Sequence, residues 1–482
     1  MPTRSHMPLR RTKIVATIGP ASSSPVLLRE LFDAGLNVAR VTLAHGTSES
    51  HVALIAAIRK EADAAGCPVG ILADLPGPKV RTTTFGEGVR MQQNDRVTLV
   101  GGGTQPSTRS MFFIDYPSLV VDLEIGDVIG IGDGTVYLRV DSKDAETLSA
   151  RVTHGGSLSG RKGVRIPAGR YRPTVPTPQD LELIAALRDS PVDILAVSFV
   201  RSAADMAAVR EAAAGDHAPW LMAKIETAAA IENLAEIIDA SDAVMVARGD
   251  LGMELPIEDV PHLQKHIIRE TVRRDKPVVV ATQMLESMIE SPTPTRAEAT
   301  DVANAVLDNT SAVMLSAETA VGRDPVGVVR TMARLLCRAE QELDPAQLHR
   351  FAFHDRNLTD LNLATAHAAW QAAHDLHAAA ILCCTRTGST ARKMASLRPL
   401  APLYGLTADP RALRQMSVCW GVHGLLLPQS SVSTEDVMRD AIAFGKARAL
   451  ALPEDIVIVL AGSPDAGPGH TDTVRVAVIV PG

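Results

Sequence analysis

Eight short apolar segments, each followed by a stretch of helix-forming residues, constrain the fold of this 482-residue chain more than any other feature. Val, Ile and Ala dominate the segments, whereas Ala, Leu and Glu are common in the stretches between them. A nearly continuous apolar run is typical of a parallel strand, because both of its faces are buried. The expected strands are Lys13–Thr17, Asn37–Val41, Val69–Ala73, Asp193–Ser198, Trp220–Ile225, Ala243–Ala247, Val278–Ala281 and Ala312–Leu315.

Eight strand–helix units predict a closed α/β barrel of the TIM, or (β/α)8, type. A doubly wound open sheet is the competing fold, but eight consecutive units favour closure. Apolar residues make up 46% of the chain and aromatic residues only 3%, so the cores must be built mainly from Ala, Val, Leu and Ile. That composition suits helices packed against parallel strands.

The barrel pattern is interrupted after its third strand. Residues 82–173 are rich in Gly, Asp, Thr and Val, and turn pairs such as Asn94-Asp95 recur at short spacing, which is typical of a small all-β domain. A second alternation of helices and strands begins near Leu343 and predicts a separate α/β domain. We expect a barrel domain over 10–81 and 174–342, an inserted small β-barrel over 82–173, and a C-terminal α/β domain over 343–482.

The net charge and the cysteine content limit which binding partners and which cellular compartment we expect. The net charge is -7 and no long basic run occurs, so nucleic acid is not an expected partner and an anionic substrate needs a local cluster of positive side chains. No apolar run is long enough for a membrane span. The five cysteines form neither a CxxC motif nor an even set, which indicates free thiols in a reducing, cytoplasmic compartment.

Polar side chains stand at or just past the carboxyl ends of six of the eight expected strands. In a barrel these ends meet at one mouth, where the active site is built. A single charged residue after a strand is usually just solvated, but six together predict a site. The residues are Arg40, Asp74, Lys224 with Glu226, Asp250, Thr282 and Ser316.

The chemistry of this set points to phosphate and a divalent metal. Glu226 and Asp250 follow neighbouring strands, and two carboxylates with substrate oxygens are a usual way to hold Mg²⁺; a salt bridge from each acid to a nearby Arg is the alternative. Lys224 lies two residues before Glu226 and so points to the same face, where an ammonium suits a transferring phosphoryl group. Arg40 adds a bidentate phosphate donor. The turn around Gly249 offers backbone N–H groups to a substrate carboxylate.

Several longer segments share their composition and order with one known family. They are Thr12–Ser22, Asn37–Arg40, Ala223–Glu226, Val246–Gly252, Ala281–Met288, Pro294–Glu298 with Asp301–Val306, and Met314–Ala320. These segments resemble the signature stretches of pyruvate kinase. The likeness covers nearly the whole chain, with the inserted β domain in the expected place.

The resemblance implies a glycolytic phosphotransferase that moves a phosphoryl group from phosphoenolpyruvate to ADP, giving pyruvate and ATP. It also implies a cytoplasmic homotetramer with an allosteric C-terminal domain. The enolate formed after transfer would be protonated through a water ordered near Thr282 and Ser316. The resemblance assigns catalytic roles to Lys224, Arg40, Thr282 and Arg81, further substrate contacts to Gly249, Asp250 and Ser316, Mg²⁺ (or Mn²⁺) binding to Glu226 and Asp250, and nucleotide binding to Arg81, Lys162 and His45.

The chain departs from the family pattern in the region that binds a monovalent cation. Thr42 and Ala44 stand where the family usually has an Asn and a Ser that help to bind potassium. The stretch that begins at Asp74 also lacks the Thr and the Glu of potassium-dependent members, with Leu75 and Lys79 present instead. The ammonium of Lys79 can occupy the place of the missing cation, so we expect an enzyme that does not require K⁺.

The C-terminal domain contains a predicted phosphate cradle, where a strand end runs into a helix N-terminus. An ordinary helix N-cap is the alternative interpretation. Residues 461–465 include no basic side chain where bisphosphate-responsive members have one, and Trp420 replaces a common Arg-Gly pair. A sugar monophosphate or AMP is therefore a better candidate effector than a bisphosphate, and the absence of any effector stays open. The cradle residues are Thr385, Arg386, Thr387, Ser389 and Thr390.

Two other functions compete with this interpretation. An aldolase or lyase of the phosphoenolpyruvate/pyruvate superfamily would share the barrel and the metal-binding carboxylates, but would need neither Lys224 nor the inserted domain. A catalytically degenerate pyruvate kinase that binds metabolites as a regulator is the non-enzyme alternative. The changes at Thr42 and Ala44 favour it, whereas the intact Lys224, Glu226 and Asp250 oppose it.

Overall fold

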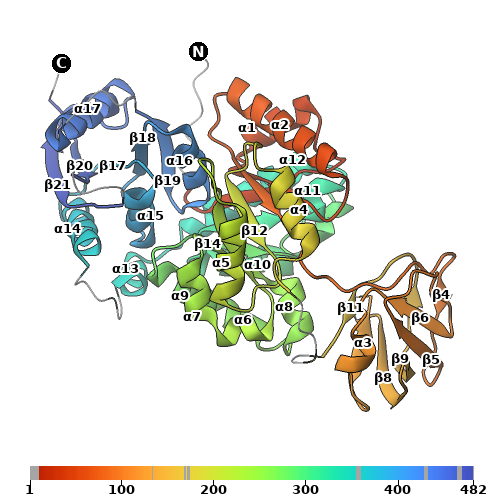
Figure 1. The fold of residues 1–482 in the computed structure, drawn as a ribbon. Coiled ribbons are helices and arrows are strands. Elements are labelled where there is room, and N and C mark those ends of the chain that lie inside the picture. Colours follow the sequence, from red (N-terminus) through yellow and green to blue (C-terminus); the bar gives the residue numbers. More distant parts are fainter. Residues whose placement is uncertain are drawn as a thin grey trace.

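The computed structural model describes residues 10–132, 134–167, 170, 174–353, 356, 360–427, 433–463 and 469–480. The chain folds into a central barrel with an all-β insertion on one side and an α/β layer on the other (Figure 1). The α/β architecture predicted from the strand pattern is thus confirmed. Part of the segment 461–465 lies outside the described residues.

Eight parallel strands form the closed barrel, and β1 pairs with both β2 and β16 to close it. Five of the eight strands have the bounds expected from the sequence, and the other three differ by one residue at each end. The competing open sheet is wrong. The strands are β1 (Lys13–Thr17), β2 (Val38–Thr42), β3 (Gly70–Asp74), β12 (Ile194–Val197), β13 (Trp220–Ile225), β14 (Ala243–Ala247), β15 (Val278–Ala281) and β16 (Ala312–Leu315).

Helices surround the barrel and begin at strong local signals. Four of them, α2, α4, α5 and α10, start with a Thr or Ser capping box, in which the cap and the third helical residue satisfy each other's backbone N–H groups. The helices of this layer are α1 (Pro25–Ala34), α2 (Ser48–Ala64), α4 (Pro178–Ala186), α5 (Ala203–Ala212), α6 (Ala228–Glu232), α7 (Leu234–Ala240), α8 (Arg248–Glu254), α9 (Val260–Arg273), η1 (Glu286–Ile289), α10 (Arg296–Leu307), α11 (Ala317–Ala320) and α12 (Pro325–Glu340).

The insertion is a six-stranded sheet with the order β11-β7-β8-β9-β5-β6 and a two-stranded sheet of β4 and β10. Residues 80–83 hydrogen-bond to both ends of the larger sheet, through bridges from Arg81 to Gly163 and from Thr82 to Ile114, so the sheet closes as the predicted small barrel. Its elements are β4 (Val89–Arg90), β5 (Arg96–Gly101), β6 (Met111–Ile114), α3 (Leu119–Asp122), β7 (Val128–Ile131), β8 (Val136–Lys143), β9 (Thr147–His154), β10 (Ser157–Leu158) and β11 (Val164–Arg165).

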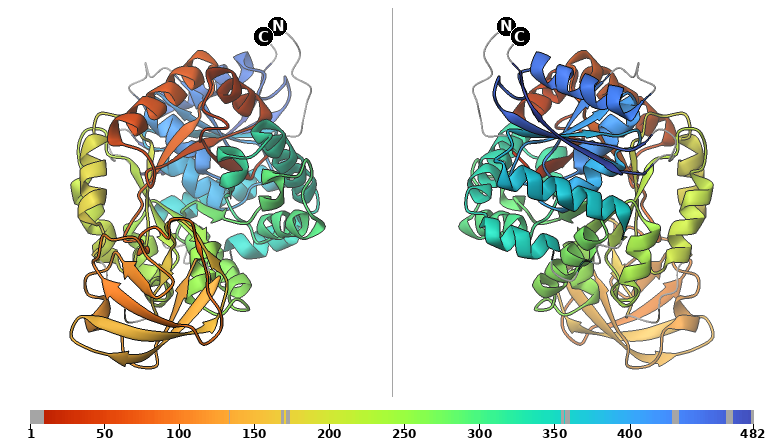
Figure 2. Two further views of the ribbon diagram at one scale, coloured as in Figure 1. Left: turned by 90° about the vertical axis from the view of Figure 1, so that its right-hand side faces the viewer. Right: turned by 90° about the vertical axis from the view of Figure 1, so that its left-hand side faces the viewer.

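The C-terminal layer is a five-stranded sheet with the order β19-β18-β17-β20-β21, in which only β21 runs antiparallel. Helices cover it, as the side views of Figure 2 show. Its elements are α13 (Pro345–Phe353), α14 (Leu361–Asp375), β17 (Ala380–Cys384), α15 (Ser389–Ser396), β18 (Leu403–Thr407), α16 (Pro410–Gln415), η2 (Met416–Val418), β19 (Val422–Leu426), α17 (Thr434–Ala447), β20 (Ile456–Ala461) and β21 (Thr473–Val478).

This layer binds the barrel at the amino ends of its strands, opposite the mouth. Asp193, directly before β12, is almost fully buried and accepts hydrogen bonds from Arg59 at 2.6 Å and from Arg414 of α16 at 2.8 Å. Lys13, the first residue of β1, donates from Nζ to the carbonyl of Val422 at 2.7 Å. Asp193 and Arg414 therefore form a buried ion pair across the contact, and Lys13 adds a hydrogen bond to a backbone carbonyl.

We predict that Asp193→Ala destabilises the protein strongly. The substitution leaves the guanidinium groups of Arg59 and Arg414 without their carboxylate in a buried contact, which costs about 3–5 kcal/mol. The midpoint of thermal unfolding should fall by several degrees in differential scanning calorimetry. The exposed Asp189→Ala is the control and should change the midpoint little; equal shifts in both variants would contradict the assignment.

Candidate active site

Arg40, Asp74 and Lys224 form a buried ionic network across the barrel mouth. Arg40 on β2 donates from Nε to Asp74 Oδ2 at 2.7 Å and from a terminal nitrogen to Thr17 at 2.8 Å. Lys224 Nζ lies 3.5 Å from the other oxygen, Asp74 Oδ1. Burial acts to raise the pKa of Asp74, but the charges of Lys224 and Arg40 outweigh it and lower that pKa. The structure therefore brings these strand ends together at one mouth, as predicted.

The Lys224 ammonium lies between two buried carboxylates and has one short hydrogen bond. Its Nζ is 3.4 Å from Glu226 Oε2 and donates to Ser198 Oγ at 2.7 Å. Burial acts to lower the pKa of Lys224, yet the charges of Asp74, Glu226 and Asp250 raise it above its ordinary value. The ammonium form is therefore favoured, which is the form that attracts a phosphoryl group.

The Glu226 carboxylate is fully buried, and its hydrogen bonding is incomplete. Oε1 accepts from the amide of Phe199 at 2.7 Å, whereas Oε2 has no hydrogen-bond donor among the described residues. Burial raises the pKa of Glu226 to about 7, against the charge of Lys224 and with a contribution from Asp250. A buried carboxylate oxygen without a donor, close to a second carboxylate, fits a divalent cation with oxygen ligands.

Lys79 reaches this second carboxylate. Its Nζ lies 3.4 Å from Asp250 Oδ1, and both side chains are partly exposed at the mouth. The sequence interpretation grouped Lys79 with Asp74, but in the structure the ion pairs of Asp74 are with Arg40 and Lys224. Lys79 therefore brings its charge next to the candidate metal-binding carboxylate.

Thr282 and Gly249 form another part of the mouth. The predicted turn around Gly249 is the first turn of helix α8, and the Gly249 amide donates to Thr282 Oγ1 at 2.9 Å. Thr282 has a φ of +70°, a conformation that costs a residue with a Cβ. Arg248 holds it there by donating to the carbonyl of Thr282 at 2.5 Å while it pairs with Asp301 at 2.7 Å.

Ser316 follows β16 at the same end of the barrel. Its amide donates to Glu318 Oε2 at 2.6 Å, and Glu318 Oε1 accepts from the amide of Leu285 at 3.2 Å. Glu318 is buried. The Glu318 carboxylate thus joins the segment after β15 to the segment after β16, and it fixes the position of Ser316 relative to the segment that contains Leu285.

The three residues assigned to nucleotide binding lie away from this network. Arg81 lies on the segment that leads from the barrel into the insertion, at the neck of the insertion, and Lys162 lies in the loop between β10 and β11 of the insertion. Both are half-buried. The Arg81 amide donates to Asp115, and the Lys162 amide donates to Thr82 Oγ1 at 3.0 Å. His45 is exposed in the loop after β2. The structure brings Arg81 and Lys162 together at one neck, and no contact that it describes links His45 to them.

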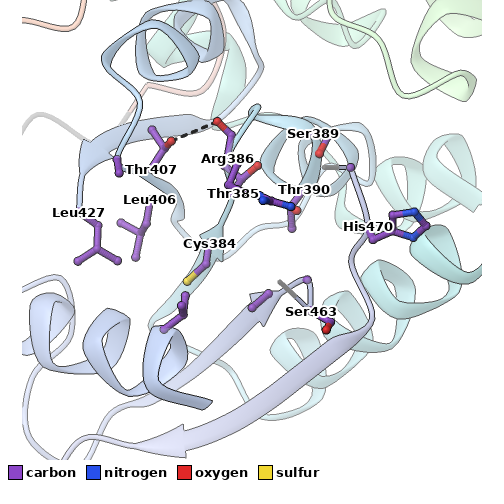
Figure 3. A pocket seen from close by; sticks show the side chains of 15 residues that line it. Cys384, Thr385, Arg386, Ser389, Thr390, Leu406, Thr407, Leu427, Ser463 and His470 are labelled. Carbon is purple, nitrogen blue, oxygen red and sulfur yellow. Dashed lines mark hydrogen bonds between the residues drawn. The ribbon is translucent and has the colours of Figure 1, made fainter. Parts of the chain in front are cut away.

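Four residues of the predicted phosphate cradle, Thr385, Arg386, Ser389 and Thr390, line a pocket in the C-terminal layer, which Figure 3 shows together with His470 and Ser463; Thr387 is not among the lining residues. Gly388, with a φ of +83°, is the N-cap of α15, and no side chain caps the described first turn of that helix. Thr385 Oγ1 accepts from the Gly388 amide at 3.0 Å, so it shapes the loop before the helix. Gly388 thus caps the helix without a side-chain hydrogen bond, so the first-turn N–H groups receive no side-chain acceptor among the described residues.

Sequence reasoning missed three residues of the site. Ser198 was included in an expected strand, although it follows the same rule of a polar residue at a strand end and could have been found by it. Arg248 lies inside Val246–Gly252, one of the segments that resemble the family, but it had no assigned role. Phe199, with a φ of +57°, could not have been found, because no local pattern predicts a left-handed backbone at a Phe.

Comparison with known proteins gives the family. A model described as the pyruvate kinase barrel domain matches residues 9–329, and one described as the pyruvate kinase alpha/beta domain matches residues 363–477. The chain belongs to the pyruvate kinase family. Pyruvate kinase 2 of Synechocystis sp. is 41% identical over 478 residues, which are 98% of this chain and 79% of that protein. A pyruvate kinase of Mycobacterium tuberculosis is 38% identical over 470 residues, 97% of this chain and 98% of its own.

These matches show a phosphotransferase of the pyruvate kinase family with a function in glycolysis. A pyruvate kinase of Geobacillus stearothermophilus is likewise 38% identical over 479 residues, 98% of this chain and 80% of that protein. The aldolase or lyase alternative has no support among these relatives.

We predict that Glu226→Gln removes a pH dependence from the stability of the metal-free protein. The pKa of about 7 lies above the ordinary carboxyl value. At pH values between that ordinary value and about 7, the folded state therefore binds more protons than the unfolded state. The stability contribution of this group is present below the unfolded-state pKa and is lost as the pH rises through about 7. In EDTA, the thermal midpoint of the parent should fall relative to that of Glu226→Gln from about pH 5 to about pH 8. The exposed Glu258→Gln should follow the parent; parallel curves for parent and Glu226→Gln would contradict the prediction.

Proposed function

We propose that the enzyme transfers a phosphoryl group from phosphoenolpyruvate to ADP in the barrel mouth, with Mg²⁺ or Mn²⁺ bound by Glu226 and Asp250. The observation that carries this proposal is the buried Lys224 ammonium beside the Glu226 carboxylate, whose Oε2 has no hydrogen-bond donor in the part of the chain that the structure describes. A bound divalent cation would neutralise charge on the phosphoryl oxygens. Membership of the family supports the choice of substrates.

The side chains have separable roles in this proposal. Lys224 stabilises charge that develops on the transferring group. Arg40 binds the substrate phosphate, and its orientation is already set by Asp74 and Thr17. Asp250, Gly249 and Thr282 contact the enolpyruvate, and Thr282 and Ser316 order the water that protonates it. The nucleotide is bound at the neck by Arg81 and Lys162, and by His45.

We predict that Lys224→Met lowers kcat by at least about a thousandfold, because the transition state loses its main fixed cation. The measurement is pyruvate formation from phosphoenolpyruvate, ADP and Mg²⁺ in a coupled assay. Lys60→Met changes an exposed lysine and should retain parental activity. Turnover of Lys224→Met close to the parental rate would contradict the mechanism. An inactive parent enzyme would contradict the proposed function and favour the regulator alternative.

We propose further that K⁺ is not required, because Lys79 supplies the monovalent positive charge. Its ammonium lies next to Asp250 rather than Asp74, so the charge acts beside the divalent cation. Thr42 and Ala44 remove the family's potassium ligands in the same region.

Lys79→Ala should reduce activity about tenfold or more in buffers with tetramethylammonium as the cation. KCl should restore part of that activity, since a free cation can then occupy the vacated position. The parent enzyme and the control Lys60→Ala should be indifferent to KCl. Activation of the parent by KCl of several-fold or more would show that Lys79 does not replace potassium.

The pocket of Figure 3 supports a phosphate-bearing effector, and we propose a sugar monophosphate or AMP. The uncapped first turn of α15 and the hydroxyl groups of Thr385, Ser389 and Thr390 suit one phosphate. Arg386 lies among the pocket residues. The described wall opposite the cradle has Ser463 and His470 rather than an arginine, which favours a monophosphate over a bisphosphate.

We also propose the division into domains at 10–81 with 174–342, 82–173 and 343–482, and a cytoplasmic homotetramer. No disulfide joins any of the five cysteines in the described structure, which suits a reducing compartment. Helices long and apolar enough to cross a bilayer are lacking in the described part of the chain. Val476 and Val478 are about half exposed on the edge strand β21, which supports self-association.

A further inference from the structure

We infer that Ser198 is a positioning residue for phosphoryl transfer, acting through Lys224. This inference rests on the proposed function, because it concerns how Lys224 is aimed at the transferring group. Ser198 is the first residue after β12, is almost fully buried, and lies next to β13, which bears Lys224. No role for it follows from the sequence segments that indicate the family.

The Ser198 hydroxyl has its donor and acceptor roles fixed. It donates to the carbonyl of Leu75 at 2.7 Å, so its lone pairs are free to accept from Lys224 Nζ, also at 2.7 Å. The carboxylates on either side of the ammonium lie farther away, at 3.4 and 3.5 Å. Coulomb attraction from two sides holds the charge in place but sets its direction weakly, whereas a hydrogen bond sets direction.

The next residue positions the other functional side chain of β13. Phe199 has a φ of +57°, and its amide donates to Glu226 Oε1 at 2.7 Å. The turn of Ser198 and Phe199 therefore contacts Lys224 through a hydroxyl and Glu226 through an amide. The strained backbone at Phe199 directs the amide to Glu226 while Ser198 faces Lys224.

The loop after β3 supports this turn from the other side. Gly77 has a φ of +63°, and a Cβ added to it would lie 2.8 Å from Ser198 Cβ and 3.0 Å from Phe199 Cδ2. A side chain at this position would displace the turn. The loop that supplies the Leu75 carbonyl and ends at Lys79 is thus packed against the same turn, so both ammonium groups of the mouth share one support.

Ser198→Ala should lower kcat roughly 10- to 100-fold, the size expected when a charged group loses an orienting hydrogen bond. The KM values for phosphoenolpyruvate and ADP should change less than about threefold, because Lys224 is most needed when charge develops in the transition state. Ser241→Ala is the matched control: Ser241 is equally buried and donates to the Ile237 carbonyl at 2.6 Å, but it lies at the amino end of β14. The control should keep kcat within about threefold of the parent.

Gly77→Ala tests the same turn from a second direction and should give the same loss of kcat. Gly86→Ala is its control, because Gly86 also has a positive φ but no atom lies within 4 Å of the added Cβ. Thermal midpoints separate positioning from loss of fold. The proposal is overturned if Ser198→Ala equals Ser241→Ala in kcat, if KM rises as much as kcat falls, or if Gly77→Ala equals Gly86→Ala. An inactive parent would instead contradict the proposed function.

Discussion

The burial of charge at the barrel mouth is the constraint on which the rest of this structure depends. Arg40, Asp74, Lys224 and Glu226 bear two positive and two negative charges, and all four are largely removed from water. Each ion taken from water alone costs several kcal/mol, and the cost is recovered only when partners and hydrogen bonds are complete. The members of the network therefore depend on one another, and the loss of any one leaves another charge buried without compensation.

The same reasoning explains why Oε2 of Glu226 has functional meaning. Among the described residues this oxygen has a cation at 3.4 Å and no hydrogen-bond donor, and Asp74 Oδ1, 3.5 Å from the same cation, likewise has none. Asp74 has two cations beside it, Arg40 and Lys224, whereas the ion pair of Glu226 is with Lys224. Burial and the nearby Asp250 keep the pKa of Glu226 near neutrality. A divalent cation would supply positive charge at this oxygen, so the cost of burying the carboxylate and the expected affinity for metal have one physical cause.

The fold could be predicted almost completely from the sequence, because each barrel strand is an apolar run of a length that only burial explains. The strand ends then gave Arg40, Asp74, Lys224, Glu226 and Thr282 as a group, since parallel strands bring their carboxyl ends together. Partner choice within the group could not be predicted. The pairing of Lys79 with one carboxylate rather than another depends on loop geometry, and a left-handed residue in a turn has no local sequence signal when it is not glycine.

The C-terminal layer matters to the mouth because it binds the opposite ends of the same strands. Arg392 of α15 lies over the ring of Trp220, with its guanidinium carbon 5.1 Å from the ring centroid, and a Cβ added to Gly388 of the cradle loop would lie 3.7 Å from that ring. Trp220 is the first residue of β13. Lys224 lies near the carboxyl end of the same strand, and Glu226 follows directly after it. The helix whose first turn forms the proposed phosphate cradle therefore contacts the amino end of the strand that bears Lys224 near its other end.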